Sequence, residues 1–390
     1  MPDYLGVPES SLDRNGGIFT AREISGQPEL WIKTYELVFE ARERIRNFLE
    51  KVLSRTETNI ILTGAGSSAF IGNSLQGPMQ KNLDRNVFAI PTTDLVSHPC
   101  LYLRKNVPTL MISFARSGDS PESSAAVSRA NKICREIHHL VITCNMDGEL
   151  ARICQSENDL VFLLPPESND QSLAMTSSFT CMLLAGLLIS SLERFPSHKK
   201  YVKLLSGYGK TLLNRYTGSL HSISRMDFQR VVFLGSGPLQ GIAQESHLKL
   251  QELTNGRIIC KHDSFLGFRH GPKAVIDETT LLVYLLTNNT RAAAYETDLA
   301  RDIEKAGRAM HSIGISEHPL ADIETDLNIV LSDRPQDSLP EEYLAIVNVL
   351  PAQVIGFFKS LELGYNPDMP SSDGTITRVV TGVTIYPYEE

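Results

Sequence analysis

Residues 59–68 read NIILTGAGSS, and residues 230–239 read RVVFLGSGPL, so one pattern occurs twice in this chain of 390 residues. In both stretches a short apolar run, rich in β-branched residues, leads into a turn of glycine and small residues. The run predicts a buried β-strand, and the turn predicts a connection into a helix. Gly64 in the first turn and Gly235 in the second lie 171 positions apart.

Three further pairs of strand-like segments repeat in the same order. TLMISF begins at Thr109 and TLLVYL begins at Thr280, again 171 positions apart. The other two pairs match more loosely: HLVIT (139–143) with HSIGIS (311–316), and DLVFLL (159–164) with DLNIVL (326–331). One match alone would mean little, but four in one order indicate a duplicated unit.

Each copy alternates short apolar strands with segments of helix length. This alternation predicts an α/β fold with two tandem, doubly wound parallel sheets, each covered by helices on both faces. We expect an N-terminal helical extension over residues 1–50, in which Thr20 to Glu23 fits a capping box. A first domain is expected over 51–195, and a second domain with the C-terminal tail over 196–390. Ligands of such sheets bind outside the carboxyl ends of the strands.

The composition narrows the class of protein. A net charge of -8 and a pI near 5.7 favour solubility and argue against a nucleic-acid-binding surface. The first residues lack the basic and apolar regions of a signal peptide, and the longest apolar run, 182–189, is far shorter than the ~20 residues of a membrane span. The six cysteines are scattered without metal-ligand spacing. We therefore expect no metal or organic cofactor, no membrane contact and a cytoplasmic location.

A phosphate-binding loop is predicted in SFARSGDSPES, which starts at Ser113, follows a predicted strand and opens a helix. Ser117, Gly118 and Ser120 would place hydroxyls and free backbone N–H groups at a helix N-terminus, where an anion is favoured. The chain has neither GxxxxGK[ST] nor GxGxxG, so a phosphate monoester fits better than a nucleotide. Serines also cap helices for structural reasons alone, and that interpretation stays open.

Two further residues carry expectations about the phosphate site. Asp119 is unfavourable beside a phosphate, so we expect its side chain to face a neighbour. Thr176, in LAMTSSFT, stands where another helix is predicted to begin, and it is a further candidate for lining the pocket.

Acid–base chemistry is suggested by a helix-like segment and a loop in the second copy. Glu245, Lys249 and Glu252 are spaced at i, i+4 and i+7 and therefore share one helix face. Such spacing is more often a salt-bridged surface. However, His270 follows 18 residues after Glu252, in the loop SFLGFRHGP, where Pro272 excludes regular helix interior. A carboxylate and an imidazole are the groups that aldose–ketose proton transfer requires, so Glu252 and His270 form a candidate pair.

These motifs together resemble a known family. GAGSSAFIG, SFARSGDSPES, GSGPLQGIAQESHLKLQEL and FLGFRHGPKAVID are similar to the sugar isomerase (SIS) domain family, and more narrowly to its galactosamine-6-phosphate deaminase/isomerase (tagatose-6-phosphate ketose/aldose isomerase) group. The resemblance covers nearly the whole chain. It implies that Glu252 moves the proton between C1 and C2, that His270 assists ring opening and that Lys249 supports the site. It also implies a phosphate and substrate site that includes Ser67, Ser68, Arg116, Ser117 and Ser120.

The chain also departs from a related motif, that of the isomerase half of glucosamine-6-phosphate synthase. The second lysine of that motif is Gln251 here, and its imine-forming tail lysine has no clear match, Thr381 being nearest. Because Met1 is followed by Pro2, we also expect that the protein has no N-terminal glutaminase domain with its terminal cysteine. Release of ammonia is therefore expected rather than synthesis of an amino sugar.

The expected reaction converts galactosamine 6-phosphate to tagatose 6-phosphate and ammonia. Three alternatives remain: aldose–ketose isomerisation without deamination, a non-catalytic sugar-phosphate-binding protein, and a structural protein that would leave Glu252 and His270 unexplained. The expected ligand is a hexosamine 6-phosphate or a ketohexose 6-phosphate, with the galacto or gluco configuration left open. The resemblance also implies a homodimer or higher homo-oligomer, in which His270 serves its own or a neighbouring subunit's site.

Overall fold

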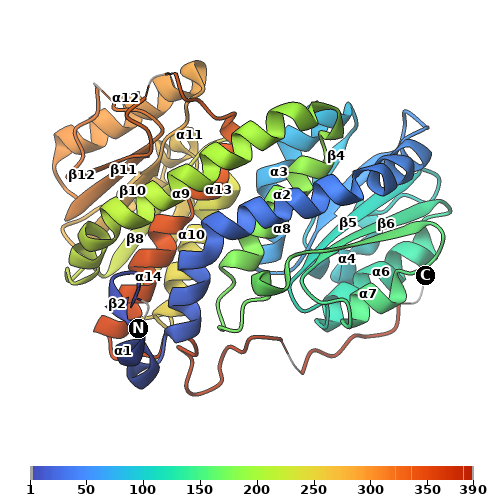
Figure 1. Cartoon of the computed structure of the whole chain (residues 1–390), viewed down its shortest axis with the longest axis horizontal. Helices are drawn as coiled ribbons and strands as arrows, with labels where there is room; N and C mark the ends of the chain where they lie inside the picture. Colours follow the sequence, from blue (N-terminus) through green and yellow to red (C-terminus); the bar gives the residue numbers. More distant parts are fainter. Residues whose placement is uncertain (1–2, 321, 335, 381, 389–390) are drawn as a thin grey trace. The chain divides into compact units, whose positions relative to one another are not determined.

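The computed structural model describes residues 3–320, 322–334, 336–380 and 382–388. Its two main sheets each have five strands, and all neighbouring strands within them are parallel (Figure 1). The first sheet has the order β4-β3-β5-β6-β7, with β3 (Asn59–Thr63), β4 (Val87–Ala89), β5 (Thr109–Ala115), β6 (Ile137–Thr143) and β7 (Asp159–Leu163). The second has the order β9-β8-β10-β11-β12, with β8 (Arg230–Leu234), β9 (Ile259–Asp263), β10 (Thr280–Leu285), β11 (His311–Ser316) and β12 (Leu327–Val330).

The two sheets repeat the same strand order and register. Asn59 pairs with Thr109 in the first sheet, and Arg230 pairs with Thr280 in the second, which are the same two positions moved by 171 residues. The glycine turns after β3 and β8 repeat as well, with Gly66 at φ 56° and ψ -128° and Gly237 at φ 57° and ψ -130°. The predicted tandem α/β fold with an internal duplication is confirmed.

The chain divides into two compact units, each built around one sheet. The first-sheet unit comprises Leu30–Asp170, Ser177–Lys199 and Gly374–Glu390, and the second-sheet unit comprises Met1–Glu29, Gln171–Thr176 and Lys200–Asp373. The long helices α2 (Ile18–Val52) and α9 (Phe195–Ser224) contribute residues to both units. These units group the termini differently from the consecutive segments 1–50, 51–195 and 196–390, which remain our proposal for the bounds of the duplicated domains.

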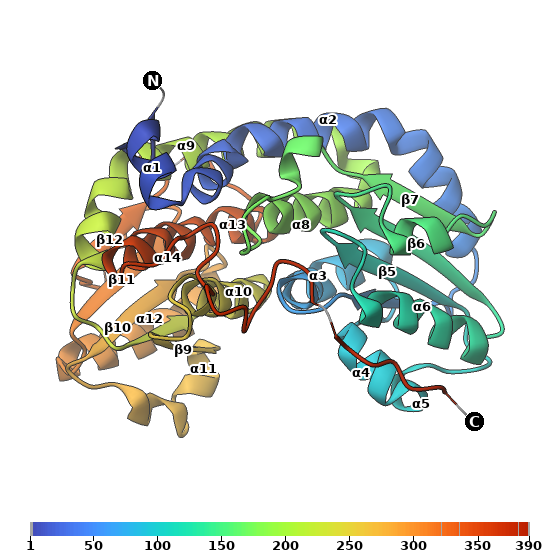
Figure 2. The same ribbon diagram turned by 90° about the horizontal axis from the view of Figure 1, so that it is seen from below.

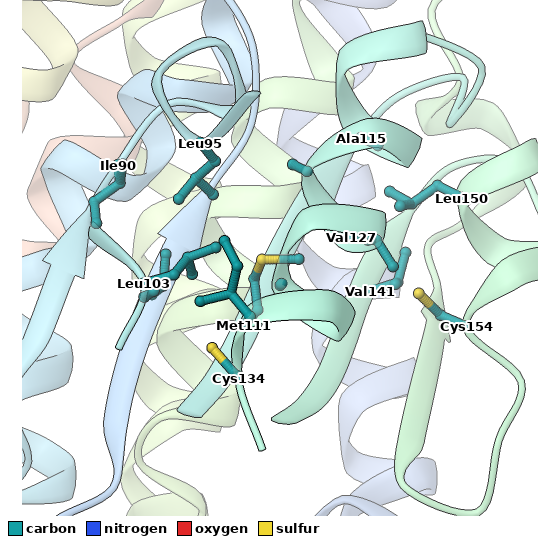
Figure 3. Close-up of a cluster of buried hydrophobic side chains, with 14 residues drawn as sticks. Ile90, Leu95, Leu103, Met111, Ala115, Val127, Cys134, Val141, Leu150 and Cys154 are labelled. Atoms are coloured by element: carbon teal, nitrogen blue, oxygen red, sulfur yellow. The ribbon is translucent and has the colours of Figure 1, made fainter. Parts of the chain in front are cut away.

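Both faces of the first sheet are buried, as the continuous apolar runs of its strands predict. One face packs against α4 (Thr92–Ser97), α6 (Pro121–Ile133) and α7 (Glu149–Ile153), and Figure 3 shows the side chains of this core, including Met111 and Val141 from the sheet. Helices α3 (Ser67–Leu83) and α8 (Ser177–Ile189) pack together, and an added Cβ on Gly186 of α8 would lie 2.5 Å from Leu75. Every residue of α8 is buried, so the apolar run 182–189 is a core helix.

The second sheet has its own core. On one face, strands β8 and β10 pack against the short helix α11 (Phe265–Phe268) and α12 (Thr290–Ala306). Helix α10 (Pro238–Leu253) contacts β8, β9 and the helix α14 (Leu350–Glu362). An added Cβ on Gly356 would lie 2.8 Å from Leu253, so this glycine permits close packing of α14 on α10. The remaining elements are β1 (Asp3–Tyr4), β2 (Val7–Pro8), α1 (Glu9–Asn15), α5 (Pro99–Tyr102), α13 (Glu341–Val347) and the 3-10 turns Pro166–Ser168, Leu192–Arg194 and Pro272–Val275.

The expected capping box at Thr20 is wrong. Helix α2 begins at Ile18, and its first turn is capped by Asp368, which accepts hydrogen bonds from the backbone of Gly17 at 2.9 Å and of Thr20 at 2.8 Å. Glu23 instead accepts a hydrogen bond from the backbone N–H of Gln171 at 2.5 Å. The cap comes from a residue almost at the other end of the chain, where a local pattern cannot reveal it.

Among the described residues, the helical segment Glu341–Glu362 has the length and hydropathy of a membrane span, and 94% of its apolar window is buried in the structure. Its contacts with α10 are those of a core helix. The end of the tail, within the first-sheet unit, runs beside α4 and α5 (Figure 2), where the hydroxyl of Tyr388 lies 2.7 Å from Cys100 Sγ.

Candidate active site

The predicted phosphate-binding residues of the first-sheet unit stand at the carboxyl ends of two adjacent strands. Thr63, the last residue of β3, pairs with Ser113 of β5, so the turn after β3 and the loop after β5 leave the same edge of the sheet. The chain passes from β3 to β4 on one side and then to β5 on the other side of β3, so the strand order reverses at β3. Open parallel sheets bind ligands at the carboxyl ends of the strands where the order reverses in this way. Ser67 and Ser68 begin α3 there and are 4% and 5% exposed.

The backbone of the turn after β3 depends on two glycines. An added Cβ on Gly64 would lie 2.5 Å from Cβ of Ser68, so only glycine lets the strand approach the helix start this closely. Gly66 has a positive φ, which L-residues with a side chain rarely adopt. The turn therefore presents the start of α3 to the sheet edge, where the helix dipole favours an anion.

The loop after β5 is held from the side of β6 and α7. Asn145 donates to the backbone oxygen of Ser117 at 2.9 Å, and the backbone N–H of Leu150 donates to the oxygen of Gly118 at 2.9 Å. The Asp119 carboxylate accepts from the backbone N–H of Glu149 at 3.0 Å. Asp119 thus caps α7, which confirms that its side chain faces a neighbour.

The hydroxyls of this loop are placed at the start of α6. Ser120 is the N-cap residue of α6, and its Oγ lies 2.7 Å from Oγ of Ser123. Ser117 Oγ accepts a weak hydrogen bond from the backbone of Asp119 at 3.3 Å. The structure therefore places five predicted residues at one edge of the first sheet: Ser67 and Ser68 at the start of α3, Ser117 and Gly118 in the loop after β5, and Ser120 at the start of α6.

Arg116, also predicted for this site, is only 7% exposed and donates to the backbone oxygen of Arg378 at 2.6 Å. Arg378 belongs to the C-terminal tail, and it donates to the backbone oxygen of Asp170 from Nε at 2.8 Å and to the side chain of Asn169 at 2.8 Å. The tail is thereby fastened next to the predicted phosphate loop. Sequence reasoning missed Arg378, because the tail has no pattern that links it to residues more than 200 positions earlier.

The start of α8 is organised by Asp170. Its carboxylate accepts from the backbone N–H groups of Ser177 at 3.0 Å and Ser178 at 2.9 Å, and from both hydroxyls. The predicted helix start near Thr176 is confirmed. Thr176 itself is fully buried and belongs to the second-sheet unit, and its place in the lining of the pocket stays a prediction. Thr381, the position nearest to a tail lysine, lies outside the described residues.

The predicted acid–base residues lie in the second-sheet unit, on α10. The Lys249 Nζ atom is 2.5 Å from Oε2 of Glu252 and 3.5 Å from Oε1 of Glu245. The side chains of Lys249 and Glu245 have no exposed surface, whereas that of Glu252 is 23% exposed. A salt-bridged surface is therefore the wrong interpretation of this spacing. Sequence reasoning left Glu245 out of the candidate site, although its position on the shared face was visible.

His270 lies on an exposed loop after α11. Ser264 caps α11, and Arg269 on the loop is paired with Asp298 of α12 at 2.6 Å. Lys273 is likewise paired with Asp302 at 2.6 Å, so the loop is fastened on both sides of the histidine. Among the residues that the structure describes, none makes a hydrogen bond or ion pair with the His270 imidazole, and Glu252 is no exception. The two ion pairs thus hold the loop that carries His270, and within the described residues of one chain no hydrogen bond joins its imidazole to Glu252.

The equivalent of the phosphate turn in the second copy is built differently. Pro238 stands where Ser67 stands in the first copy, which removes both a hydroxyl and a backbone donor. An added Cβ on Gly237 would lie 3.7 Å from Oε1 of Glu341. Glu341 also accepts a hydrogen bond from the hydroxyl of Thr287. A carboxylate stands beside this turn, which makes it unsuitable for a phosphate.

Comparison with known proteins adds to this geometry. The family model described as SIS domain matches residues 53–191. A D-galactosamine-6-phosphate deaminase AgaS from Shewanella sp. (strain ANA-3) is 39% identical over 98% of this chain and 96% of its own. The crystal structure of a proposed tagatose-6-phosphate ketose/aldose isomerase from Clostridium novyi NT has a TM-score of 0.97 and 42% identity over 100% of both chains. That of tagatose-6-phosphate ketose/aldose isomerase from Escherichia coli has a TM-score of 0.88 and 36% identity over 96% of this chain and 98% of its own.

Proposed function

Since the chain belongs to the SIS domain family, as a relative of the galactosamine-6-phosphate deaminases, we propose that it converts galactosamine 6-phosphate and water to tagatose 6-phosphate and ammonia. The observation that carries this proposal is the Glu252 carboxylate, partly exposed and held at 2.5 Å by the buried Lys249 ammonium. A carboxylate kept in place in this way is suited to moving a proton between two adjacent carbons.

In the proposed reaction, the serines at the edge of the first sheet bind the phosphate. A phosphate accepts hydrogen bonds from hydroxyls and from the N–H groups of a helix start. Ser67 begins α3, Ser120 is the N-cap residue of α6, and Ser117 adds a hydroxyl in the loop before α6. The shape of the Gly66 turn and the cap of Asp119 on α7 supply the rigid support that such a site needs.

The chemical steps require a base at C2 and a proton carrier at the ring oxygen. His270 delivers a proton to the ring oxygen as the bond between C1 and that oxygen breaks, and it takes up the proton that the C1 hydroxyl loses, so that the pyranose opens to the aldehyde. Glu252 removes the proton from C2, which leaves an enolamine, and the same carboxyl returns a proton to C1. The resulting imine at C2 adds water and releases ammonia, leaving the ketose 6-phosphate.

The test is an ammonia-release assay with galactosamine, glucosamine and N-acetylgalactosamine 6-phosphates. We expect turnover of galactosamine 6-phosphate, with Glu252→Gln lowering kcat by ~100-fold or more and leaving KM nearly unchanged, as the loss of a general base does. A variant that keeps more than roughly a tenth of the wild-type rate would remove Glu252 from this role.

A second candidate function is isomerisation without deamination, which the names of the two similar crystal structures favour. The same Glu252 would transfer the proton between C1 and C2 of a sugar phosphate without nitrogen. Conversion of tagatose 6-phosphate to an aldose 6-phosphate, without any release of ammonia from hexosamine phosphates, would select this alternative.

We further propose that the protein acts as a homo-oligomer in which His270 completes a neighbouring subunit's site. The support is the exposed position of His270 and the absence of a contact with Glu252 in the described chain. Mixing two inactive variants, His270→Ala and Glu252→Gln, should then restore activity, because some sites receive both intact residues. The six cysteines are all free, which supports a reducing, cytoplasmic location.

A further inference from the structure

Two histidines that have no part in the proposed reaction lie ring to ring in the second-sheet unit. His247 is on α10, and His262 is on β9, the edge strand that packs against this helix. The centroids of their imidazole rings are 4.7 Å apart, and the ring planes are inclined by 46°. Among the residues that the structure describes, none makes a hydrogen bond or ion pair with the His262 imidazole, so its nitrogens are not committed to another group.

Both rings line a pocket of about 410 Å³. This volume holds an ion together with several water molecules, since one water occupies about 30 Å³. The other lining residues are Gln240, Cys260, Lys261 and Asp263. Nζ of Lys261 lies 3.6 Å from Oδ2 of Asp263, so these two charges offset each other. An ion that enters the pocket therefore meets two imidazoles, and the lining residues add no net positive charge.

The separation of the two rings agrees with a shared ion. A zinc ion lies about 2.0–2.1 Å from an imidazole nitrogen, which places it about 3.2 Å from the ring centroid. Two such rings are about 4.5 Å apart when the two bonds make a right angle, and about 5.2 Å apart at the tetrahedral angle. The observed 4.7 Å lies between these values. The described residues contain no group of three or more histidine, cysteine, aspartate or glutamate side chains that could hold a metal ion, so an ion here would have two protein ligands and otherwise water.

Both imidazoles are in the protonation state that binds metals. Burial is the main cause that lowers the pKa of His247 to about 4, and the neighbouring His262 contributes to the shift. Burial also lowers the pKa of His262, with Lys261 contributing and Asp263 opposing. A neutral imidazole has a free lone pair, so near pH 7 an ion does not have to displace a proton from either ring.

We propose that His247 and His262 form a binding site for a divalent transition-metal ion such as Zn²⁺, which joins α10 to β9. Imidazole nitrogen suits zinc, nickel and copper, whereas magnesium and calcium prefer oxygen ligands. The ion is exchangeable and takes no part in the proposed reaction, so the inference goes beyond the proposed function and does not rest on it. Half the ligands of a structural zinc site supply about half of its binding free energy, which corresponds to a Kd of roughly 1–200 µM.

Isothermal titration calorimetry of the full chain with Zn²⁺ tests the proposal, after any affinity tag has been cleaved and bound metal has been removed with EDTA. We expect one saturable site per chain, and no binding of Mg²⁺ at the same concentrations. His247→Gln and His262→Gln should each weaken Zn²⁺ binding by ~10-fold or more, because a single imidazole remains. A wild-type Kd above about 1 mM, equal binding of Mg²⁺, or an unchanged Kd in either variant would overturn the proposal.

His221→Gln is the matched control. His221 belongs to the same unit, and its ring stacks on Phe358 with the centroids 4.0 Å apart, so its ring partner cannot bind a metal. This variant should keep the wild-type Kd within about twofold, and a loss as large as that of His262→Gln would also overturn the proposal. Where His247→Gln is poorly folded without metal, His247→Phe keeps an aromatic ring beside His262 and should show the same weakening. Zn²⁺ should also raise the Tm of the wild type and of His221→Gln but not of the other variants, because only a bound ion stabilises the folded chain; an equal rise in all of them would contradict the assignment.

Discussion

Replacement of Glu296 by glutamine should stabilise the protein in alkaline solution and leave it almost unchanged in acid. Glu296 lies on α12 and is 1% exposed. Burial is the main cause that raises the pKa of Glu296 from 4.5 to about 7; the hydrogen bond from the Thr287 backbone at 2.8 Å opposes the rise, and the nearby Glu341 adds to it. The folded state therefore favours the protonated carboxyl.

The sign and size follow from this shift in pKa. Below pH 4.5 the carboxyl is protonated in both the folded and the unfolded chain, so it costs no stability. As the pH rises from 4.5 to 7, folding opposes an ionisation that the unfolded chain undergoes freely, and stability is lost. Above pH 7 the loss reaches a plateau of about 3 kcal/mol, since each pKa unit corresponds to ~1.4 kcal/mol. Glutamine carries no charge and keeps an oxygen for the Thr287 N–H, so Glu296→Gln avoids the loss.

Differential scanning calorimetry at pH 5 and pH 8.5 measures this effect. A unit of about 200 residues changes its Tm by ~2–4 °C per kcal/mol, so Glu296→Gln should raise the Tm at pH 8.5 by roughly 6–12 °C and at pH 5 by about a quarter of that. The exposed Glu324→Gln is the matched control and should shift neither Tm. The reasoning is refuted if the gain of Glu296→Gln over wild type is the same at both pH values.

Three further outcomes follow from the first-sheet unit. Ser117→Ala should raise KM for galactosamine 6-phosphate by ~10-fold with kcat within about threefold, as steady-state kinetics would show; a selective loss of kcat would contradict an anchoring role. Gly66→Ala should lower the free energy of unfolding in urea by about 1–3 kcal/mol because its φ is 56°, whereas Gly77→Ala, in open space on α3, should be neutral or stabilising. Arg378→Met should lower the free energy of unfolding by about 1–3 kcal/mol and speed thermolysin cleavage of the tail, because the backbone oxygen of Asp170 loses its charged donors. An unchanged cleavage rate would show that Tyr388 and its neighbours hold the tail without Arg378.

The fold could be predicted from the sequence because its determinants are local. The apolar run and glycine turn of each copy lie within ten residues, and their repetition predicted the two sheets and the sheet edge at which the segments of Ser67 and Ser117 both leave their strands. The spacing of Glu245, Lys249 and Glu252 likewise placed them on one helix face. The spacing could not reveal that two of these side chains are completely buried. Their burial depends on segments such as α14, which packs on α10 although it lies about 100 residues further along the chain.

The interactions that sequence reasoning missed join distant segments. Asp368 caps α2 from 348 residues away, and Arg378 bonds to the oxygen of Asp170 from 208 residues away. A capping residue or a tail arginine has no periodic pattern, so only the folded chain brings such partners together. The prediction of a capping box at Thr20 was wrong for this reason. The carboxylate that caps the helix belongs to Asp368, which is close to Thr20 in the fold but far from it along the chain.

The two glycine turns indicate that the two copies share a common origin. Gly66 and Gly237 keep the same unusual backbone angles 171 positions apart, as expected of two copies of one ancestral gene. The second copy has Pro238 and Glu341 at its turn, while the first copy has no counterpart of Lys249 and Glu252 on its own helix, where Pro78 and Lys81 occupy the equivalent positions. On the function proposed above, the phosphate-binding serines belong to the first copy and the proposed base belongs to the second. We therefore expect that neither copy expressed alone releases ammonia from galactosamine 6-phosphate.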